Sequence, residues 1–320
     1  MERFDCMEAT TAKIHTAMLA GELTCRELTE FCLERIAAYD QKGPRLNAVI
    51  MVNPRAAEEA QRLDAELGRS GKLSGPLHGI PVLLKDNINT FDMPTTAGSL
   101  SLAGVVPRGD AWVTAQIRKA GAVILAKANL HEFALWGETV SSLLGQTLNP
   151  YDLTRTPGGS SGGTGAGIAA NFAVVGFGTD TVNSIRSPCS ANSLVGIRPT
   201  LGLVSRCGIV PYSLTQDTAG PICRTVEDAA RALDVVAGYD SSDAETARSA
   251  GMLPPQGYAA ALKADGMRGK RIGILESFFG KGAHHAEVNR VMRQALELFP
   301  QNGAETVPLD AAIDPARLVS

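Results

Sequence analysis

Two serines in glycine-rich turns are the residues whose type and setting most directly suggest chemistry. Ser160 lies in a Gly-Gly-Ser-Ser-Gly-Gly loop, and Ser184 closes a second turn of small residues. Glycines in such numbers let the backbone turn tightly or approach another group closely. A predicted helix over residues 166–173 and a buried strand over 174–178 would pack between the turns and bring the serines together. Hydroxyl chemistry and two ordinary glycine-rich connections of an α/β protein both remain open here.

Lys85 is the third candidate, because it directly follows a predicted buried strand over residues 80–84. Its ammonium group must leave the core or find partners. A lysine in this position usually extends to water or pairs with a neighbour, here Asp86. Alternatively, burial lowers its pKa so that the neutral amine acts as a base.

The glycine loop does not fit the common nucleotide-binding motifs. The Gly-Gly-Thr of residues 162–164 lacks the lysine of a P-loop, and Ile168 stands where a dinucleotide fingerprint needs its third glycine. Neither serine lies in Gly-x-Ser-x-Gly, and no histidine is near either in sequence. A serine activated by something other than histidine remains, and lysine is the other known partner for that role.

Composition narrows the class of protein. The chain has 320 residues and a net charge of −3, with no basic tract, so a nucleic-acid surface is not indicated. The six cysteines form no CxxC pair, which is typical of reduced thiols in a cytoplasmic protein. We expect no signal segment and no membrane span. His131 has no metal-ligand spacing to another histidine, so we expect neither a metal nor a cofactor.

The elements that must position these residues alternate between helix and strand. This alternation predicts an α/β fold with a central mixed or parallel sheet covered by helices on both faces. We expect residues 1–70 to form an N-terminal helical layer, and residues 71–320 to form the α/β core of what is one domain overall. Predicted helices cover residues 9–20, 24–39, 54–67, 111–120, 166–173, 224–238 and 288–299, and predicted strands cover 47–53, 80–84, 123–127, 174–178, 194–200 and 270–275. Thr24 and Glu27 form a predicted capping box, and residues 217–221 a predicted turn.

Five motifs follow one another along the chain. They are PLHGIPVLLKDNI around Lys85, GQTLNP at residues 145–150, PGGSSGG at 157–163, GTDTVNSIRSP at 178–188 and LVGIRPT at 194–200. Together they resemble the amidase signature family, and the resemblance runs from about residue 24 to the strand near residue 275. Members generally continue well beyond this length, so we expect the fold to be incomplete at the C-terminus and the chain to be a truncated form.

The resemblance implies a Ser–cis-Ser–Lys triad. Ser184 is then the nucleophile, Ser160 the bridging serine in a cis peptide bond, and Lys85 the base. Ser160 lies 75 residues after Lys85, and Ser184 lies 24 residues after Ser160, which agrees with the family's arrangement. The implied oxyanion hole consists of the backbone N–H groups of Thr181, Val182, Asn183 and Ser184.

The turn before Ser184 departs from the family, which usually has Gly-Gly where this chain has Val182-Asn183. Backbone donors survive any side chain, so the hole can still form. Valine at positive φ would be strained, whereas asparagine tolerates it. We therefore expect a tighter or differently shaped pocket, in which the Asn183 side chain could also act as a donor.

The residues around this turn have expected structural roles. Asp180 and Arg186 are expected to pair or cap a turn, Asp217 to form a turn near the site, and Cys189 to be a small buried residue.

The function implied by the resemblance is hydrolysis of a carboxylic amide to a carboxylate and ammonia or an amine, through an acyl-enzyme on Ser184. The expected partner is a small-molecule amide substrate, and a homodimer is left open. One alternative is the glutaminase component of a tRNA-dependent amidotransferase, which implies partner subunits. Another is a scaffold whose site is impaired by truncation or by Val182-Asn183.

Overall fold

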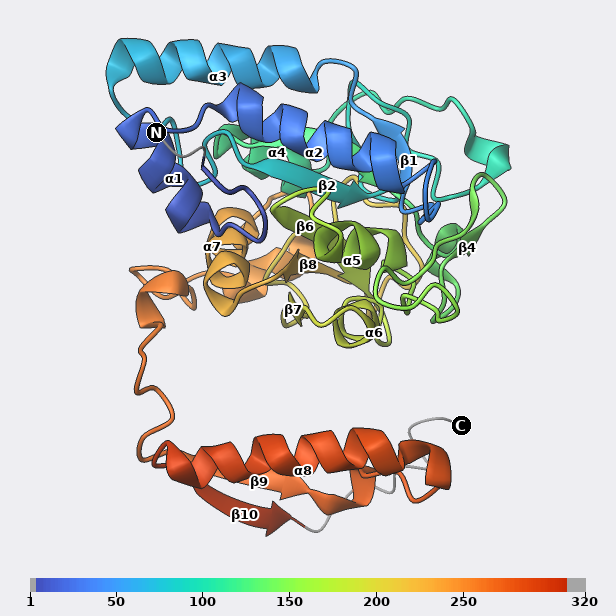
Figure 1. Ribbon diagram of the computed structural model, residues 1–320, viewed down its shortest axis with the longest axis vertical. Coiled ribbons are helices and arrows are strands. Elements are labelled where there is room, and N and C mark those ends of the chain that lie inside the picture. The colour runs from blue at the N-terminus through green and yellow to red at the C-terminus, as the bar shows by residue number, and fades with distance from the viewer. Residues whose placement is uncertain (1–3, 310–320) are drawn as a thin grey trace. The chain divides into compact units, whose positions relative to one another are not determined.

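The computed structural model describes residues 4–309 and divides the chain into two compact units, residues 1–260 and 261–320. The core unit runs from blue to orange in Figure 1, and the C-terminal unit is the orange-red to red part. The sequence did not indicate a division at residue 260. The predicted boundary at residue 70 lies inside the core unit, where residues 49–52 already form a strand of the sheet.

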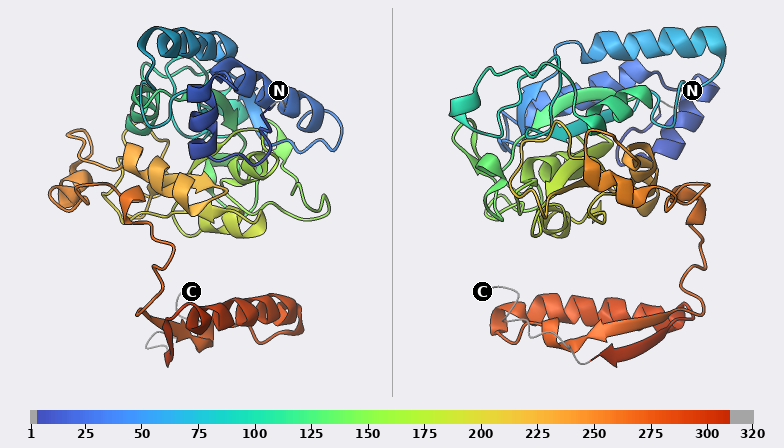
Figure 2. Two further views of the ribbon diagram at one scale, coloured as in Figure 1. Left: turned by 60° about the vertical axis from the view of Figure 1, so that its left-hand side comes forward. Right: turned by 180° about the vertical axis from the view of Figure 1, so that it is seen from behind.

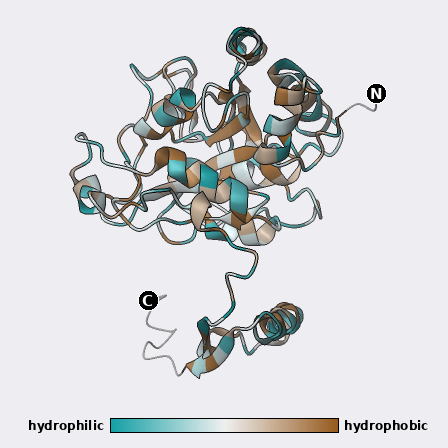
Figure 3. Ribbon diagram, turned by 90° about the vertical axis from the view of Figure 1, so that its left-hand side faces the viewer, coloured by the Kyte–Doolittle hydropathy of each residue, from teal (hydrophilic) through white to brown (hydrophobic). Residues whose placement is uncertain are grey.

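The core unit is built on one mixed sheet of six strands. In spatial order these are β1 (Val49–Val52), β3 (Val123–Ala128), β2 (Pro81–Lys85), β6 (Val175–Asp180), β8 (Thr218–Cys223) and β7 (Val195–Gly196). Strand β2 pairs in parallel with both β3 and β6, and the remaining pairs are antiparallel. The central strands are fully buried, and Figure 3 shows hydrophobic segments in the interior of this unit. The predicted mixed sheet is therefore confirmed.

Helices lie on both faces of this sheet (Figure 2). They are α1 (Thr11–Ala20), α2 (Cys25–Tyr39), α3 (Ala56–Ser70), α4 (Trp112–Lys119), α5 (Gly162–Ala169), α6 (Arg186–Ala191) and α7 (Val226–Val236). The predicted capping box starts α2: the Thr24 side chain accepts a hydrogen bond from Glu27 N, and the Glu27 carboxylate accepts one from Thr24 N. A small hairpin pairs β4 (Val140–Ser141) with β5 (Gly145–Gln146).

Helix α5 begins four residues before the predicted start at residue 166, inside the glycine loop. Tertiary packing explains the difference, because this helix lies so close to its neighbours that only glycine fits. A Cβ added at Gly163 would lie 2.3 Å from the carbonyl oxygen of Asn129, and one at Gly167 would lie 2.6 Å from Leu83 Cδ1. Glycines that suggested a loop are helical residues of close approach.

The region after Ser184 also differs from the prediction. Residues 217–221 are not a turn, because residues 218–223 form β8 and pair along the whole of β6. Residues 186–191 form α6, which was not predicted.

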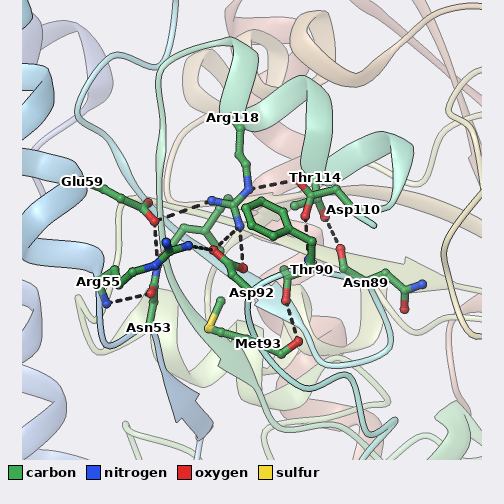
Figure 4. Close-up of polar contacts among 12 residues, drawn as sticks. Asn53, Arg55, Glu59, Asn89, Thr90, Asp92, Met93, Asp110, Thr114 and Arg118 are labelled. Carbon is green, nitrogen blue, oxygen red and sulfur yellow. Dashed lines mark hydrogen bonds and ion pairs between the residues drawn. The ribbon is translucent and has the colours of Figure 1, made fainter. Parts of the chain in front are cut away.

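The long connection between β2 and α4 is fixed by an ion-pair network (Figure 4). Arg118 of α4 contacts Asp92 at 2.7 Å, Asp110 at 3.0 Å and Glu59 of α3 at 3.8 Å. Its guanidinium also lies 4.9 Å from the centre of the Phe91 ring. The network ties this connection to two helices, and so helps to hold the backbone that follows Lys85.

The C-terminal unit contains a βαβ arrangement. Strand β9 (Arg271–Leu275) leads into helix α8 (Ala286–Gln301), and β10 (Glu305–Leu309) returns to pair with β9 in parallel. The predicted strand at residues 270–275 and helix at 288–299 correspond to β9 and α8. Across residues 4–309, every helix is too short or too polar to cross a membrane.

Candidate active site

Lys85 ends β2 as a fully buried side chain. Its Nζ donates hydrogen bonds to Ser160 Oγ at 2.7 Å and to Thr179 Oγ1 at 2.8 Å. Side chains alternate between the faces of a strand, so Lys85 points to the same face as Leu83, which is the face covered by α5. Lys85 therefore neither extends to water nor pairs with Asp86.

Burial lowers the pKa of Lys85 to about 7. The carboxylates of Asp180 and Asp217 act in the opposite direction, since negative charge favours the ammonium form. The desolvation is larger, so an appreciable fraction of this lysine is a neutral amine near neutral pH.

A second buried lysine lies on the opposite face of the sheet. Lys127 of β3 is fully buried, and its Nζ lies 2.9 Å from Asp86 Oδ1. Asp86 also accepts hydrogen bonds from the backbone N–H and the hydroxyl of Thr96. Because Asp86 is used in this pair, it offers Lys85 no counter-ion.

Ser160 lies at the end of the loop that leads into α5, and the peptide bond between Gly159 and Ser160 is cis. Only glycine fits at residue 159, because a Cβ there would lie 1.9 Å from the carbonyl oxygen of Glu138. The neighbouring Ser161 donates its N–H to the Ser184 carbonyl at 3.3 Å and its hydroxyl to the Thr179 carbonyl at 3.2 Å. The structure thus brings the two serine-bearing turns together.

Asp180 anchors the turn that carries Ser184. This fully buried carboxylate accepts hydrogen bonds from Ile185 N at 3.0 Å and Arg186 Nε at 3.2 Å, and it lies 3.4 Å from Arg198 Nε. Arg186 also donates to the Val182 carbonyl. Asp180 and Arg186 pair as expected, and the pair holds the turn in place.

The turn leaves a row of backbone donors without acceptors. Within residues 4–309, the N–H groups of Thr181, Val182, Asn183 and Ser184 donate no hydrogen bond. The Thr181 hydroxyl donates to Asp217, whose other oxygen accepts from Tyr212 N at 2.8 Å. Asp217 therefore fixes the start of this row.

The expected strain at Val182 does not arise. Neither Val182 nor Asn183 has a positive φ, so the turn takes a conformation that residues with a Cβ accept. Val182 is 68% exposed, and its side chain is directed away from the core. Ser184 itself is only 7% exposed.

A cavity of about 210 Å³, here called the Thr179 cavity, lies beside the site. Its walls include Thr179, Arg206, Cys207, Ile209, Pro211 and Leu214. The Arg206 guanidinium is paired with Asp243 at 2.8 Å, so its charge is neutralised at the wall.

Sequence reasoning did not single out Thr179. It lies inside the GTDT motif, but only the fold shows that its hydroxyl contacts Lys85. Cys189, by contrast, is buried as expected, and burial raises the pKa of its thiol to about 12. No group of side chains suited to holding a metal ion occurs in the described part of the chain.

Comparison with known proteins decides the family. Residues 27–318 match the family model described as Amidase. The chain belongs to the amidase family. This agrees with the resemblance of its motifs to the amidase signature.

Relatives of this amidase-family chain include an amidase and one component of a larger enzyme. It is 43% identical over 296 residues to a probable amidase of Arabidopsis thaliana, covering 90% of this chain and 57% of the relative. It is 40% identical over 305 residues to the A-type component of a glutamyl-tRNA(Gln) amidotransferase from Maridesulfovibrio salexigens, covering 95% and 60%.

The structure of a peptide amidase from Stenotrophomonas maltophilia has a TM-score of 0.88 and 45% sequence identity to this chain. That match covers 95% of this chain and 62% of the peptide amidase. The chain therefore spans about three fifths of the length of these relatives.

Proposed function

We propose that this amidase-family chain hydrolyses a carboxylic amide through an acyl-enzyme on Ser184, with Ser160 as the proton relay and Lys85 as the base. The observation that carries the proposal is the 2.7 Å contact between Lys85 Nζ and Ser160 Oγ in a fully buried setting. A lysine with a pKa of about 7 can take up and release a proton near neutral pH.

In the first step, neutral Lys85 takes the proton of Ser160, and Ser160 takes the proton of Ser184. Ser184 Oγ attacks the amide carbonyl, and the new C–O bond converts the carbonyl into a tetrahedral oxyanion. When the C–N bond breaks, the proton held on Lys85 returns through Ser160 to the departing nitrogen. Water then attacks the acyl-enzyme, using the same relay, and releases the carboxylate and the free Ser184.

The oxyanion would be held by backbone N–H groups from Thr181, Val182, Asn183 and Ser184. This assignment is supported by their lack of acceptors in the described residues and by the anchoring of the turn through Asp180 and Asp217. Each such donor is worth about 3 kcal/mol of transition-state stabilisation. Because the donors are backbone groups, Val182 and Asn183 serve as well as glycine does.

The Thr179 cavity favours an amide with a small, uncharged acyl group. Ile209, Pro211 and Leu214 give it an apolar lining, and its arginine is already neutralised by Asp243. A charged acyl group would be desolvated there without a free partner.

The test uses a fluorophosphonate probe, which reacts with activated serines. We expect the chain to be labelled and Ser184→Ala to abolish labelling. Ser190→Ala is the matched control, because Ser190 is an exposed serine of α6 six residues further on, and it should leave labelling unchanged. Labelling that survives in Ser184→Ala would refute the assignment, and an unlabelled wild-type chain would favour a catalytically silent scaffold.

A second candidate function is that of the glutaminase component of an amidotransferase, the enzyme to which the relative from Maridesulfovibrio salexigens belongs. The near equality of its identity to that of the probable amidase supports keeping both. The two are separated by ammonia release from a panel of aliphatic, aryl and peptide amides and from glutamine. Turnover of the panel by the chain alone supports the amidase, whereas turnover of glutamine only with added partner proteins supports the amidotransferase.

A further inference from the structure

Asn87 is a buried amide that contacts the base from behind. It lies two residues after Lys85 and is only 3% exposed. Its Nδ2 donates to Thr179 Oγ1 at 3.2 Å and to the Val210 carbonyl at 3.4 Å. Since Thr179 Oγ1 also accepts from Lys85 Nζ at 2.8 Å, Asn87 and Lys85 share one hydroxyl.

The orientation of the Asn87 amide follows from its partners. The Val210 carbonyl can only accept, so the amide must turn Nδ2 and not Oδ1 towards it. Oδ1 accepts no hydrogen bond from the rest of residues 4–309. Thr179 therefore receives an N–H from Asn87 whether Lys85 is charged or neutral.

This arrangement determines how a neutral Lys85 can be oriented. A threonine hydroxyl has two acceptor lone pairs. Asn87 occupies one, and an N–H of Lys85 occupies the other. With an N–H of the amine committed to Thr179, its lone pair is left for the contact with Ser160 Oγ.

We infer that Asn87 is a positioning residue: it holds Thr179 so that the lone pair of Lys85 faces Ser160. The inference rests on the proposed function for its catalytic meaning, but the contact between Asn87, Thr179 and Lys85 does not.

The same residue connects the base to the wall of the Thr179 cavity. Val210 N donates to the Asn87 carbonyl at 2.8 Å, and Ile88 forms an antiparallel bridge with Ile209. Ile209 lines the cavity, as does Thr179. A displacement of this wall would therefore move Asn87 and, through Thr179, the base.

The charges around Lys85 make the amide a sensitive position. Asp180 from β6 and Asp217 from the residue before β8 already favour its ammonium form. Asp86 and Lys127 form a pair on the other face of the sheet. Asn87 adds a hydrogen-bond donor without a charge, so Asn87→Asp would add a third carboxylate on the side of the base.

The first test is the titration of Lys85 in the full chain, followed by NMR of ¹³C-labelled lysine side chains and assigned with Lys85→Met. In Asn87→Asp we expect the pKa of Lys85 to rise by at least about one unit, because the added carboxylate favours the ammonium. Asn89→Asp is the matched control: it makes the same change two residues further on, at a side chain without contact to Thr179, and should leave the titration in place.

The second test is the pH dependence of fluorophosphonate labelling. Its acidic limb should move to higher pH in Asn87→Asp by the same amount as the titration. Asn87→Leu, which keeps the volume and removes the donor, should lower the rate on the plateau about 10- to 100-fold. Thermal unfolding is measured for each variant, so that a misfolded one is recognised.

The outcomes separate this inference from the proposed function. An unchanged titration in a folded Asn87→Asp, or an equal shift in Asn89→Asp, overturns the role of Asn87. If the titration shifts but the wild-type chain is not labelled, the proposed function fails, and the coupling between Asn87 and Lys85 stands.

Discussion

The two buried lysines show how the same side chain can be placed for chemistry or for stability. Lys127 has a carboxylate partner, and an ion pair of this kind offsets much of the cost of burial. Lys85 contacts only hydroxyl groups. Its burial therefore costs stability, and the cost is greatest where the amine must bind a proton in the unfolded chain but not in the folded one.

Replacing Lys85 tests this at the residue scale. Its pKa is about 7 in the folded chain against 10.5 unfolded, so the free energy of unfolding rises with pH across that window. Lys85→Met removes the penalty but leaves two hydroxyls with fewer partners. We expect it to raise the free energy of unfolding by about 2 kcal/mol at pH 7, with the gain shrinking towards pH 10. Urea unfolding at several pH values measures it.

Lys127→Met is the contrasting variant, because it leaves Asp86 charged and unpaired. It should lower the free energy of unfolding by about 3 kcal/mol. A loss of stability in Lys85→Met as large as in Lys127→Met would contradict the account. Labelling should disappear in Lys85→Met, and in the wild type its rate should rise with pH through about 7, where Lys85 loses its proton.

At the scale of elements, the position of α5 decides where Ser160 lies. Its glycines allow an approach so close that a Cβ at Gly163 would lie 2.3 Å from a backbone oxygen. Backbone cannot withdraw as a flexible side chain can, so the helix itself must move.

We expect Gly163→Ala to lower the free energy of unfolding by about 2 to 3 kcal/mol and to slow labelling of Ser184. Gly68→Ala is the matched control, since Gly68 lies in α3 with nothing within 4 Å of an added Cβ. That change should stabilise the chain by about 0.5 to 1 kcal/mol. Equal effects of the two substitutions would show that close packing is not what the Gly163 position requires.

The sequence predicted elements better than it predicted their ends. Hydrophobic periodicity and caps located α2 and α7, because these depend on local residues. The start of α5 and the existence of β8 depend on what packs against them, and a window of sequence does not contain that information.

The same limit applies to the site. Lys85, Ser160 and Ser184 stand in quoted motifs, and their alignment with the family needed no coordinates. Asn87 and Thr179 also lie in those motifs, but their contact joins residues 92 positions apart. The conformation of Val182 was misjudged because a glycine in relatives was taken to require a positive φ.

At the scale of the molecule, the hydrophobic core lies within the first unit. The buried cluster runs from Ala9 to Val236, and Tyr258 packs against it. We therefore expect the chain shortened to residues 1–260 to fold alone and to retain the main thermal transition of residues 1–320 within about 3 °C. Differential scanning calorimetry of both forms measures this. A lowering of more than about 8 °C would show that residues 261–320 contribute to the stability of the core unit.

The distribution of thiols gives this molecule a built-in attachment point. Among its six cysteines, all of them in the described region, Cys207 alone is exposed, while Cys6 is half-buried and the other four are buried. Cys207 also lines the Thr179 cavity. A maleimide dye under mild conditions should therefore attach at the wall of this cavity without any engineered residue, and its fluorescence would report when a small amide enters or leaves.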